Sequence, residues 1–181
     1  DELKQLGIKN TKQDQGNIRF TGTLTDAYMV CLWSRVAIRV LLPIAHLHAE
    51  TPEQLYEGVN SLPWEEHIHE LDSTIAVDFN SFRSKIKHSQ YGAQRVKDAI
   101  VDRFVESGVM RPSVSKLAPK IVIHARLHRD EVTICIDLSG KSLHQRYYRQ
   151  STGEAPLKEH VASAMLYRSG YVEQVRQNQF V

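Results

Sequence analysis

The chain has 181 residues, of which 41% are hydrophobic and 24% are charged, and its formal net charge is only +2. This composition is typical of a folded globular protein and excludes a disordered chain. No apolar run approaches the ~18 residues of a membrane-spanning helix, so the sequence predicts no membrane partner.

The first forty residues predict the end of a helix, a hairpin and a second helix. The chain opens with the pattern of a helix that ends at Gly7, and the two extended runs that follow turn at Gly16. Residues 24–39 predict the second helix, in which Trp33 is expected to lie in the core. Since the chain starts within a helix and without a methionine, we expect it to be a fragment or a processed form of a longer protein.

A strand, a helix and a second strand are expected between residues 40 and 82. The first strand contains Pro43, which predicts a sheet edge or a β-bulge at this position. Pro52 suits the first turn of the helix, and residues 73–82 alternate in the manner of a strand. The whole stretch contains eight acidic side chains and no Lys or Arg.

Residues 83–129 are basic, with eleven Lys or Arg and three acids. The elements expected from here on are a helix over residues 89–104, a loop over residues 107–119, a β-hairpin over residues 120–138 that turns at Arg129 and Asp130, and a last helix that ends at Gly170. A chain with such unequal halves has a dipolar surface, and its basic side would select a polyanion.

The strongest functional signal is the basic loop that runs into the helix at residues 89–104, because no acidic residue occurs from Phe79 to Lys97. Ser89 is expected to cap this helix, and Gly92 to let a ligand approach the backbone, where the N–H groups and the helix dipole would favour a phosphate. An ordinary amphipathic helix with a solvated basic face explains the stretch equally well. The candidate contacts here are Arg83, Lys85, Lys87, Ser89, Gln90, Tyr91, Gln94, Arg95 and Lys97.

Two further stretches add positive charge. Alternation puts Lys120 and Arg126 on the polar face of the predicted hairpin, together with His124 and His128. No acid occurs from Leu138 to Gly153, where a second group of candidates gathers: Arg146, Tyr147, Tyr148 and Arg149. Tyrosine beside arginine is suited to stacking on unpaired bases, although packing of the same side chains inside the fold is an equally good explanation.

Catalytic and metal chemistry have little support in the sequence. Cys31 and Cys135 lie in apolar surroundings far from each other, which predicts reduced thiols in a cytoplasmic protein. His46 and His48 are spaced for one strand face, but no third ligand accompanies them, so no metal is expected. The chain has no GxGxxG fingerprint, no P-loop and no signature of a nucleophile.

The order helix, helix, strand, helix, strand, strand resembles a THUMP domain. The segments that carry the resemblance are LWSRVAIRVLLP, SQYGAQRVKDAIVD, IVIHARLHRDEVTICIDLSGKSLHQRYYR and APLKEHVASAMLYRSGY. More closely, the chain is similar to the amino-terminal part of the bacterial bifunctional 23S ribosomal RNA guanine methyltransferases. The resemblance implies an α+β fold with three parts: the remainder of a ferredoxin-like subdomain over residues 1–25, a THUMP domain over residues 26–137, and a linker into the start of an absent methyltransferase domain over residues 138–181.

The same resemblance implies a function. THUMP domains bind RNA and present it to a separate catalytic domain, so we expect large-subunit ribosomal RNA as the partner, and no DNA. The parent protein would be an S-adenosylmethionine-dependent guanine-N2-methyltransferase, whereas this chain would hold no cofactor and no catalytic residue, because it lacks the family's Asp-Pro-x-Cys-Gly-Ser-Gly and Asn-Pro-Pro-Tyr motifs. Pro156, Lys158 and Glu159 match the segment that lies by the methionine end of the cofactor in related methyltransferases. The alternative is a protein-interaction module that uses the acid-rich face of residues 50–78.

Overall fold

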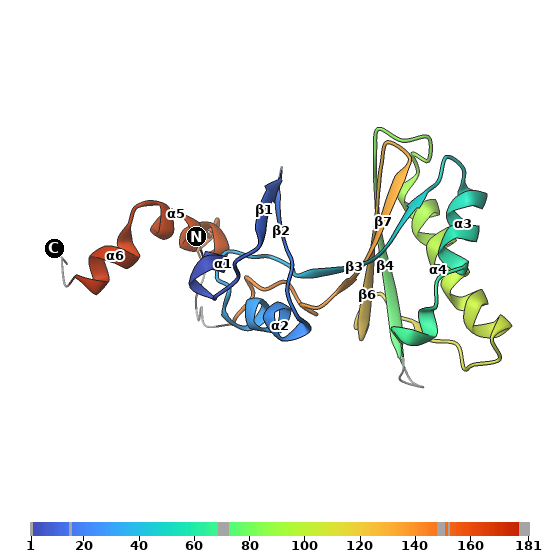
Figure 1. The fold of residues 1–181 in the computed structure, drawn as a ribbon, viewed down its shortest axis with the longest axis horizontal. Coiled ribbons are helices and arrows are strands. Elements are labelled where there is room, and N and C mark those ends of the chain that lie inside the picture. Colours follow the sequence, from blue (N-terminus) through green and yellow to red (C-terminus); the bar gives the residue numbers. More distant parts are fainter. Residues whose placement is uncertain (1, 15, 69–72, 148–150, 152, 178–181) are drawn as a thin grey trace. The chain divides into compact units, whose positions relative to one another are not determined.

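A five-stranded mixed sheet with helices on one face forms the core of residues 41–140, which are one compact unit of the chain (Figure 1). Residues 1–40 and 141–181 form a second unit. The structure is a computed structural model and describes residues 2–14, 16–68, 73–147, 151 and 153–177. Within these residues, no helix combines the length and the apolar character that crossing a membrane requires.

The sheet has the strand order β3-β7-β6-β4-β5. Its strands are β3 (Leu41–His48), β4 (Thr74–Phe82), β5 (Ser113–Val114), β6 (Ile121–His128) and β7 (Glu131–Asp137). β6 pairs antiparallel with β7 and parallel with β4. As predicted, the β6–β7 hairpin turns at Arg129 and Asp130, whose φ angles of 53° and 63° suit a type I′ turn. Pro43 lies on the edge strand β3 next to a β-bulge, which confirms that prediction as well.

The loop predicted over residues 107–119 is interrupted by a short strand. Ser113 and Val114 form β5 and pair in parallel with the start of β4. A two-residue strand is too short to show alternation of apolar and polar side chains, so β5 could not be predicted from the sequence.

Helices α3 (Pro52–Asn60) and α4 (Ser89–Glu106) pack on one face of the sheet (Figure 1). Thr51 caps α3 by accepting the N–H of Gln54 at 3.3 Å, and a 3₁₀ turn, η1 (Trp64–Glu66), follows. The indole of Trp64 is buried and donates to the carbonyl of Val59 at 2.7 Å. The largest fully buried side chains are Trp64, Phe104, Leu55, Ile75, Ile100, Ile123, Leu127 and Ile134. Helix and strand faces thus meet in one apolar core, as the periodicity predicts.

The start of α4 differs from the prediction at two positions. Ser89 is the first helical residue, and the N-cap is His88, whose side chain makes no capping hydrogen bond. Gly92 is buried, and a Cβ added to it would lie 2.4 Å from the Phe79 ring. The expected approach of a ligand to this backbone is therefore wrong, because Gly92 serves the close packing of α4 on β4.

The second unit contains short elements. They are α1 (Glu2–Gln5), β1 (Thr11–Asp14), β2 (Asn17–Phe20), α2 (Leu24–Trp33), α5 (Glu159–Arg168) and α6 (Tyr171–Arg176). The φ angles of Gly7, Gly16 and Gly170 are 86°, 78° and 75°, which fits their predicted places at helix ends and in the hairpin turn. No secondary structure was predicted from the sequence for the segment that forms α6.

Helix α2 is shorter than the predicted helix over residues 24–39. It ends at Trp33, and Ser34 takes an extended conformation. The Glu2 carboxylate explains this end, because it accepts the Ser34 hydroxyl at 2.6 Å and the backbone N–H of Arg35 at 2.7 Å. Trp33 is 56% exposed, so its predicted place in the core is wrong.

Candidate nucleic-acid interface

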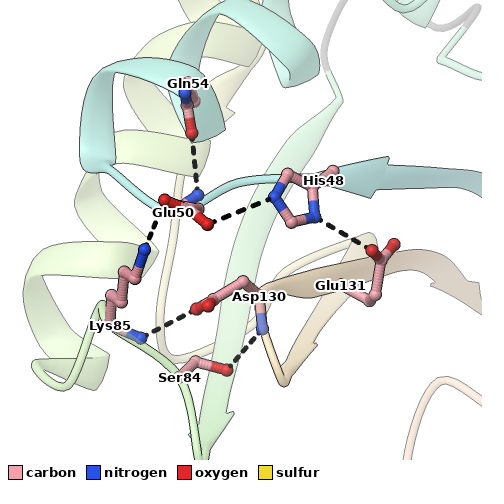
Figure 2. A network of polar contacts seen from close by, with 7 residues as sticks. All are labelled: His48, Glu50, Gln54, Ser84, Lys85, Asp130 and Glu131. Carbon is pink, nitrogen blue, oxygen red and sulfur yellow. Dashed lines mark hydrogen bonds and ion pairs between the residues drawn. The ribbon is translucent and has the colours of Figure 1, made fainter.

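A network of polar contacts fixes the basic loop over residues 83–88 (Figure 2). The Asp130 side chain accepts the backbone N–H of Lys85 at 2.8 Å, and the Asp130 backbone donates to the Ser84 hydroxyl at 3.0 Å. The Lys85 ammonium forms an ion pair with Glu50. The loop is therefore tied both to the β6–β7 turn and to the connection between β3 and α3.

The same network continues along the edge of the sheet. Glu50 donates its backbone N–H to the Gln54 amide oxygen at 2.8 Å, and His48 Nδ1 lies 2.9 Å from the Glu131 carboxylate. The Glu131 carboxylate raises the pKa of His48, and the Glu50 carboxylate raises the pKa of Lys85. Lys85 is thus paired with a carboxylate of its own unit, and this contact gives the lysine a structural role in the loop.

Three cations around the loop have a different environment. Arg83, Lys87 and Arg126 are exposed, and within the described part of the chain no carboxylate lies within ion-pair distance of any of them. We call these three residues the free cations. They can attract a polyanion without first breaking an internal ion pair.

Helix α4 presents four of the other candidates to solvent. Ser89, Gln90, Tyr91 and Gln94 are exposed on its first turns. Lys97 pairs with the adjacent Asp98. Lys97 also borders a shallow cavity of about 370 Å³, whose other lining residues are Val101, Arg111, Pro112, Ser113 and Val114. The cavity brings Lys97 and Arg111 together. Arg111 is not among the residues predicted from the sequence to contact RNA.

Arg95 has a packing role. Its guanidinium lies 4.5 Å from the ring centroid of Tyr56, and the Tyr56 hydroxyl donates to Asp102 at 2.8 Å. The Asp102 carboxylate raises the pKa of this tyrosine. These contacts join α3 to α4, so Arg95 lies between two helices of the fold.

The sheet face opposite the two helices is only partly basic. His124 lies between two carboxylates, with Nδ1 3.0 Å from Asp78 and Nε2 3.2 Å from Asp137. Arg126 follows on the same face, and Lys120, just before β6, is exposed. On β7, burial raises the pKa of the Cys135 thiol to about 11, which makes it a poor nucleophile.

The candidates in the second unit separate into three groups. Arg146 donates to the carbonyls of Cys31 at 2.7 Å and Ser34 at 3.0 Å, so it caps the end of α2. Tyr147 is 73% exposed and accepts a hydrogen bond from Lys141 at 3.4 Å. Tyr148 and Arg149 lie outside the described residues.

The segment expected near a cofactor leads into α5. Pro156 and Lys158 are exposed, and Glu159 is the first residue of the helix. Among the described residues, no three His, Cys, Asp or Glu side chains are arranged to hold a metal ion.

Three of the six described acids in the acid-rich stretch have an ion-pair partner. Glu50 pairs with Lys85, Asp78 with His124, and Glu65 with Arg103 at 2.6 Å. Glu70 and Asp72 lie outside the described residues. Three of the eight acids are exposed with no ion pair to a described residue: Glu53, Glu57 and Glu66.

One feature of this surface was not foreseen from the sequence. Phe82, the last residue of β4, is 61% exposed and stacks on His128 of β6, with ring centroids 5.8 Å apart. The alternation of the strand could have indicated this exposure. Phe82 follows Asp78 and Asn80 at alternate positions, so it lies on the same outward face of the sheet as these two polar residues.

Comparison with known protein families matches both parts of the chain. Residues 49–137 match the THUMP domain, and residues 1–41 match the RlmL ferredoxin-like domain. The protein named ribosomal RNA large subunit methyltransferase K/L from Aeromonas salmonicida is 48% identical over 171 residues, which are 94% of this chain and 24% of the relative. The chain therefore spans about a quarter of the length of the curated relatives it matches.

Two solved structures share the fold of this chain. A predicted N6-adenine-specific DNA methylase from Listeria monocytogenes has a TM-score of 0.79 at 32% identity, over 92% of this chain and 43% of that one. A protein described as a methyltransferase, solved in complex with SAH, has a TM-score of 0.78 at 30% identity, over 92% of this chain and 44% of that one. The chain therefore contains a THUMP domain preceded by an RlmL ferredoxin-like domain.

Proposed function

We propose that this chain binds ribosomal RNA and presents it to a methyltransferase domain of the same protein. The observation that carries the proposal is that the free cations lie within the residues that match the THUMP domain. Phosphate contacts from these side chains would position the RNA without specifying its sequence. The proposed contacts are Arg83, Lys87, Ser89, Gln90, Tyr91, Gln94, Lys97, Lys120, Arg126 and Tyr147.

The role of the whole protein is part of the same proposal. Relatives named large-subunit ribosomal RNA methyltransferases support an enzyme that acts on ribosomal RNA. We propose further that this enzyme is cytoplasmic, uses S-adenosylmethionine and methylates a guanine amine of 23S ribosomal RNA. The neighbour in complex with SAH supports the cofactor class. In this proposal residues 138–181 lead into the catalytic domain, and Pro156, Lys158 and Glu159 lie near the cofactor there.

A pair of charge reversals tests the RNA-binding role. Lys87→Glu should weaken binding of a structured 23S ribosomal RNA fragment by about tenfold, measured by fluorescence anisotropy at constant salt. Lys116→Glu is the matched control: it makes the same charge change on the same unit, but Lys116 follows β5, which pairs with the opposite end of β4. Equal loss in both variants, or no loss in either, would argue against the proposed surface.

The protein-interaction alternative makes a separate prediction. If the exposed acids of residues 50–78 dock a basic protein, Glu53→Lys/Glu57→Lys would abolish that interaction and Lys87→Glu would leave it unchanged. The ion pairs of Glu50 with Lys85 and of Glu65 with Arg103 reduce the negative charge of this stretch, so we favour the RNA-binding surface.

A further inference from the structure

We infer that Phe82 and His128, with Arg83 over the same phenylalanine, form a platform on which an unpaired RNA base stacks. The inference rests on the proposed RNA binding and deepens it, since it names the part of the RNA that this surface would take. We call these three residues the stacking platform.

The geometry places three planar groups together. Phe82 and His128 are Cα partners in the parallel β4–β6 pair, and their rings lie 5.8 Å apart with planes only 14° from parallel. The Arg83 guanidinium lies 5.1 Å from the centroid of the Phe82 ring. Phenylalanine, histidine and the arginine guanidinium are side chains on which nucleobases stack.

The exposure of Phe82 has no explanation inside the described fold. The helices α3 and α4 pack on the other side of the sheet, where the neighbouring Phe79 is buried. Phe82 stays 61% exposed although His128 and Arg83 both contact it. A large apolar ring in this position is costly in water and gains most from a ligand with a flat apolar face.

The backbone also favours this arrangement. Arg83 has a φ of 53°, which is uncommon for a residue other than glycine. The next residues are held rigidly, because Ser84 and Lys85 both bond to Asp130. The loop network therefore holds the residues next to Arg83, whose guanidinium lies over the Phe82 ring.

Charge complementarity identifies the occupant as nucleic acid. Arg83 is itself part of the platform, Lys87 follows it in the chain, and Arg126 precedes His128 on β6 by two residues, on the same sheet face. Free cations thus accompany a stacking surface, which is the combination that single-stranded nucleic acid requires. A base-paired helix would offer phosphates but no free base face.

The test compares two RNAs that differ in unpaired bases. Both are hairpins whose two strands are joined by a non-nucleotide linker, so that neither has unpaired loop bases. One carries a short single-stranded 3′ overhang, and the other is blunt and has the same number of phosphates. Phe82→Leu keeps an apolar side chain but removes the π face. It should weaken binding to the overhang RNA by about fivefold to a hundredfold and leave binding to the blunt hairpin unchanged.

Two controls accompany this variant. Tyr28→Leu makes the same kind of change at another exposed aromatic residue, in the other unit, and should bind both RNAs as the wild type does. Phe82→Tyr restores an aromatic ring and should restore the affinity for the overhang. With 2-aminopurine in the overhang, saturating wild-type protein should quench the fluorescence by stacking, and saturating Phe82→Leu protein should not.

The outcomes separate the two proposals. If the wild type binds RNA in a salt-dependent manner, but Phe82→Leu binds the overhang equally well and quenches 2-aminopurine equally, the stacking platform is wrong and the RNA-binding role stands. An equal loss on both RNAs also overturns the platform. If the wild type binds neither RNA, both proposals fail.

Discussion

At the scale of single residues, a glycine controls how closely α4 approaches the sheet. Gly92 is buried, and its missing Cβ would lie 2.4 to 2.7 Å from three atoms of the Phe79 ring. Both residues belong to the densely packed side of the sheet, where a methyl group cannot be accommodated without a shift of the ring or the helix. Gly92 thus acts on stability, in contrast to the free cations a few residues away.

Gly92→Ala should lower the free energy of unfolding by about 1–3 kcal/mol, because overpacking outweighs the gain in helix propensity of up to about 1 kcal/mol. Urea denaturation measures the change. Gly58→Ala in α3 is the matched control, since its added Cβ would meet only the flexible end of Leu47 at 3.3 Å, and it should be neutral or stabilising. A Gly92→Ala protein as stable as the wild type would show that this packing is looser than described.

At the scale of elements, the end of α2 depends on partners far along the chain. Glu2 bonds to the residues that follow the helix, and the Arg146 guanidinium satisfies the carbonyls of Cys31 and Ser34. The last carbonyls of a helix have no partner within it, so a charged donor there stabilises the terminus. Arg146 was expected to contact RNA, and its observed contacts give it a structural role.

Arg146→Gln should therefore lower the melting temperature, with a loss of about 1–2 kcal/mol in the free energy of unfolding, because two charge-assisted hydrogen bonds disappear. Arg168→Gln, an exposed residue at the end of α5, is the control and should be neutral. The opposite pattern, in which Arg146→Gln unfolds like the wild type but loses RNA affinity, would assign Arg146 to the RNA surface instead.

The sequence predicted the elements whose signals are local. Alternation located β4 and the β6–β7 hairpin, and Pro52 marked the start of α3, because each signal lies within the element itself. The end of α2 escaped prediction, since Glu2 and Arg146 lie 32 and 112 residues from Ser34. Similarly, the basic character of residues 83–97 was visible, but the partner of Lys85 lies 35 residues away. The basic residues are visible in the sequence, but the fold determines which of them have a carboxylate partner.

At the scale of the whole molecule, the net charge is only +2, but acidic and basic residues are concentrated in different parts of the chain. Many of the acids are paired with cations of the same unit, and those pairs leave the free cations as local sources of positive potential. Such a surface would attract RNA from solution through phosphate contacts, and the affinity from these contacts would fall as the salt concentration rises. The affinity from the stacking platform would depend on salt much less.

The most direct test of RNA binding through the free cations is the salt dependence of affinity for a single-stranded RNA. The logarithm of the binding constant should fall linearly with the logarithm of salt concentration, with a slope of about −0.7 per phosphate contact. If each free cation contacts one phosphate, Arg83→Gln/Lys87→Gln/Arg126→Gln should make the slope less steep by about 2, whereas Lys116→Gln should not change it. A triple variant with the slope and affinity of the wild type would contradict RNA binding at this surface.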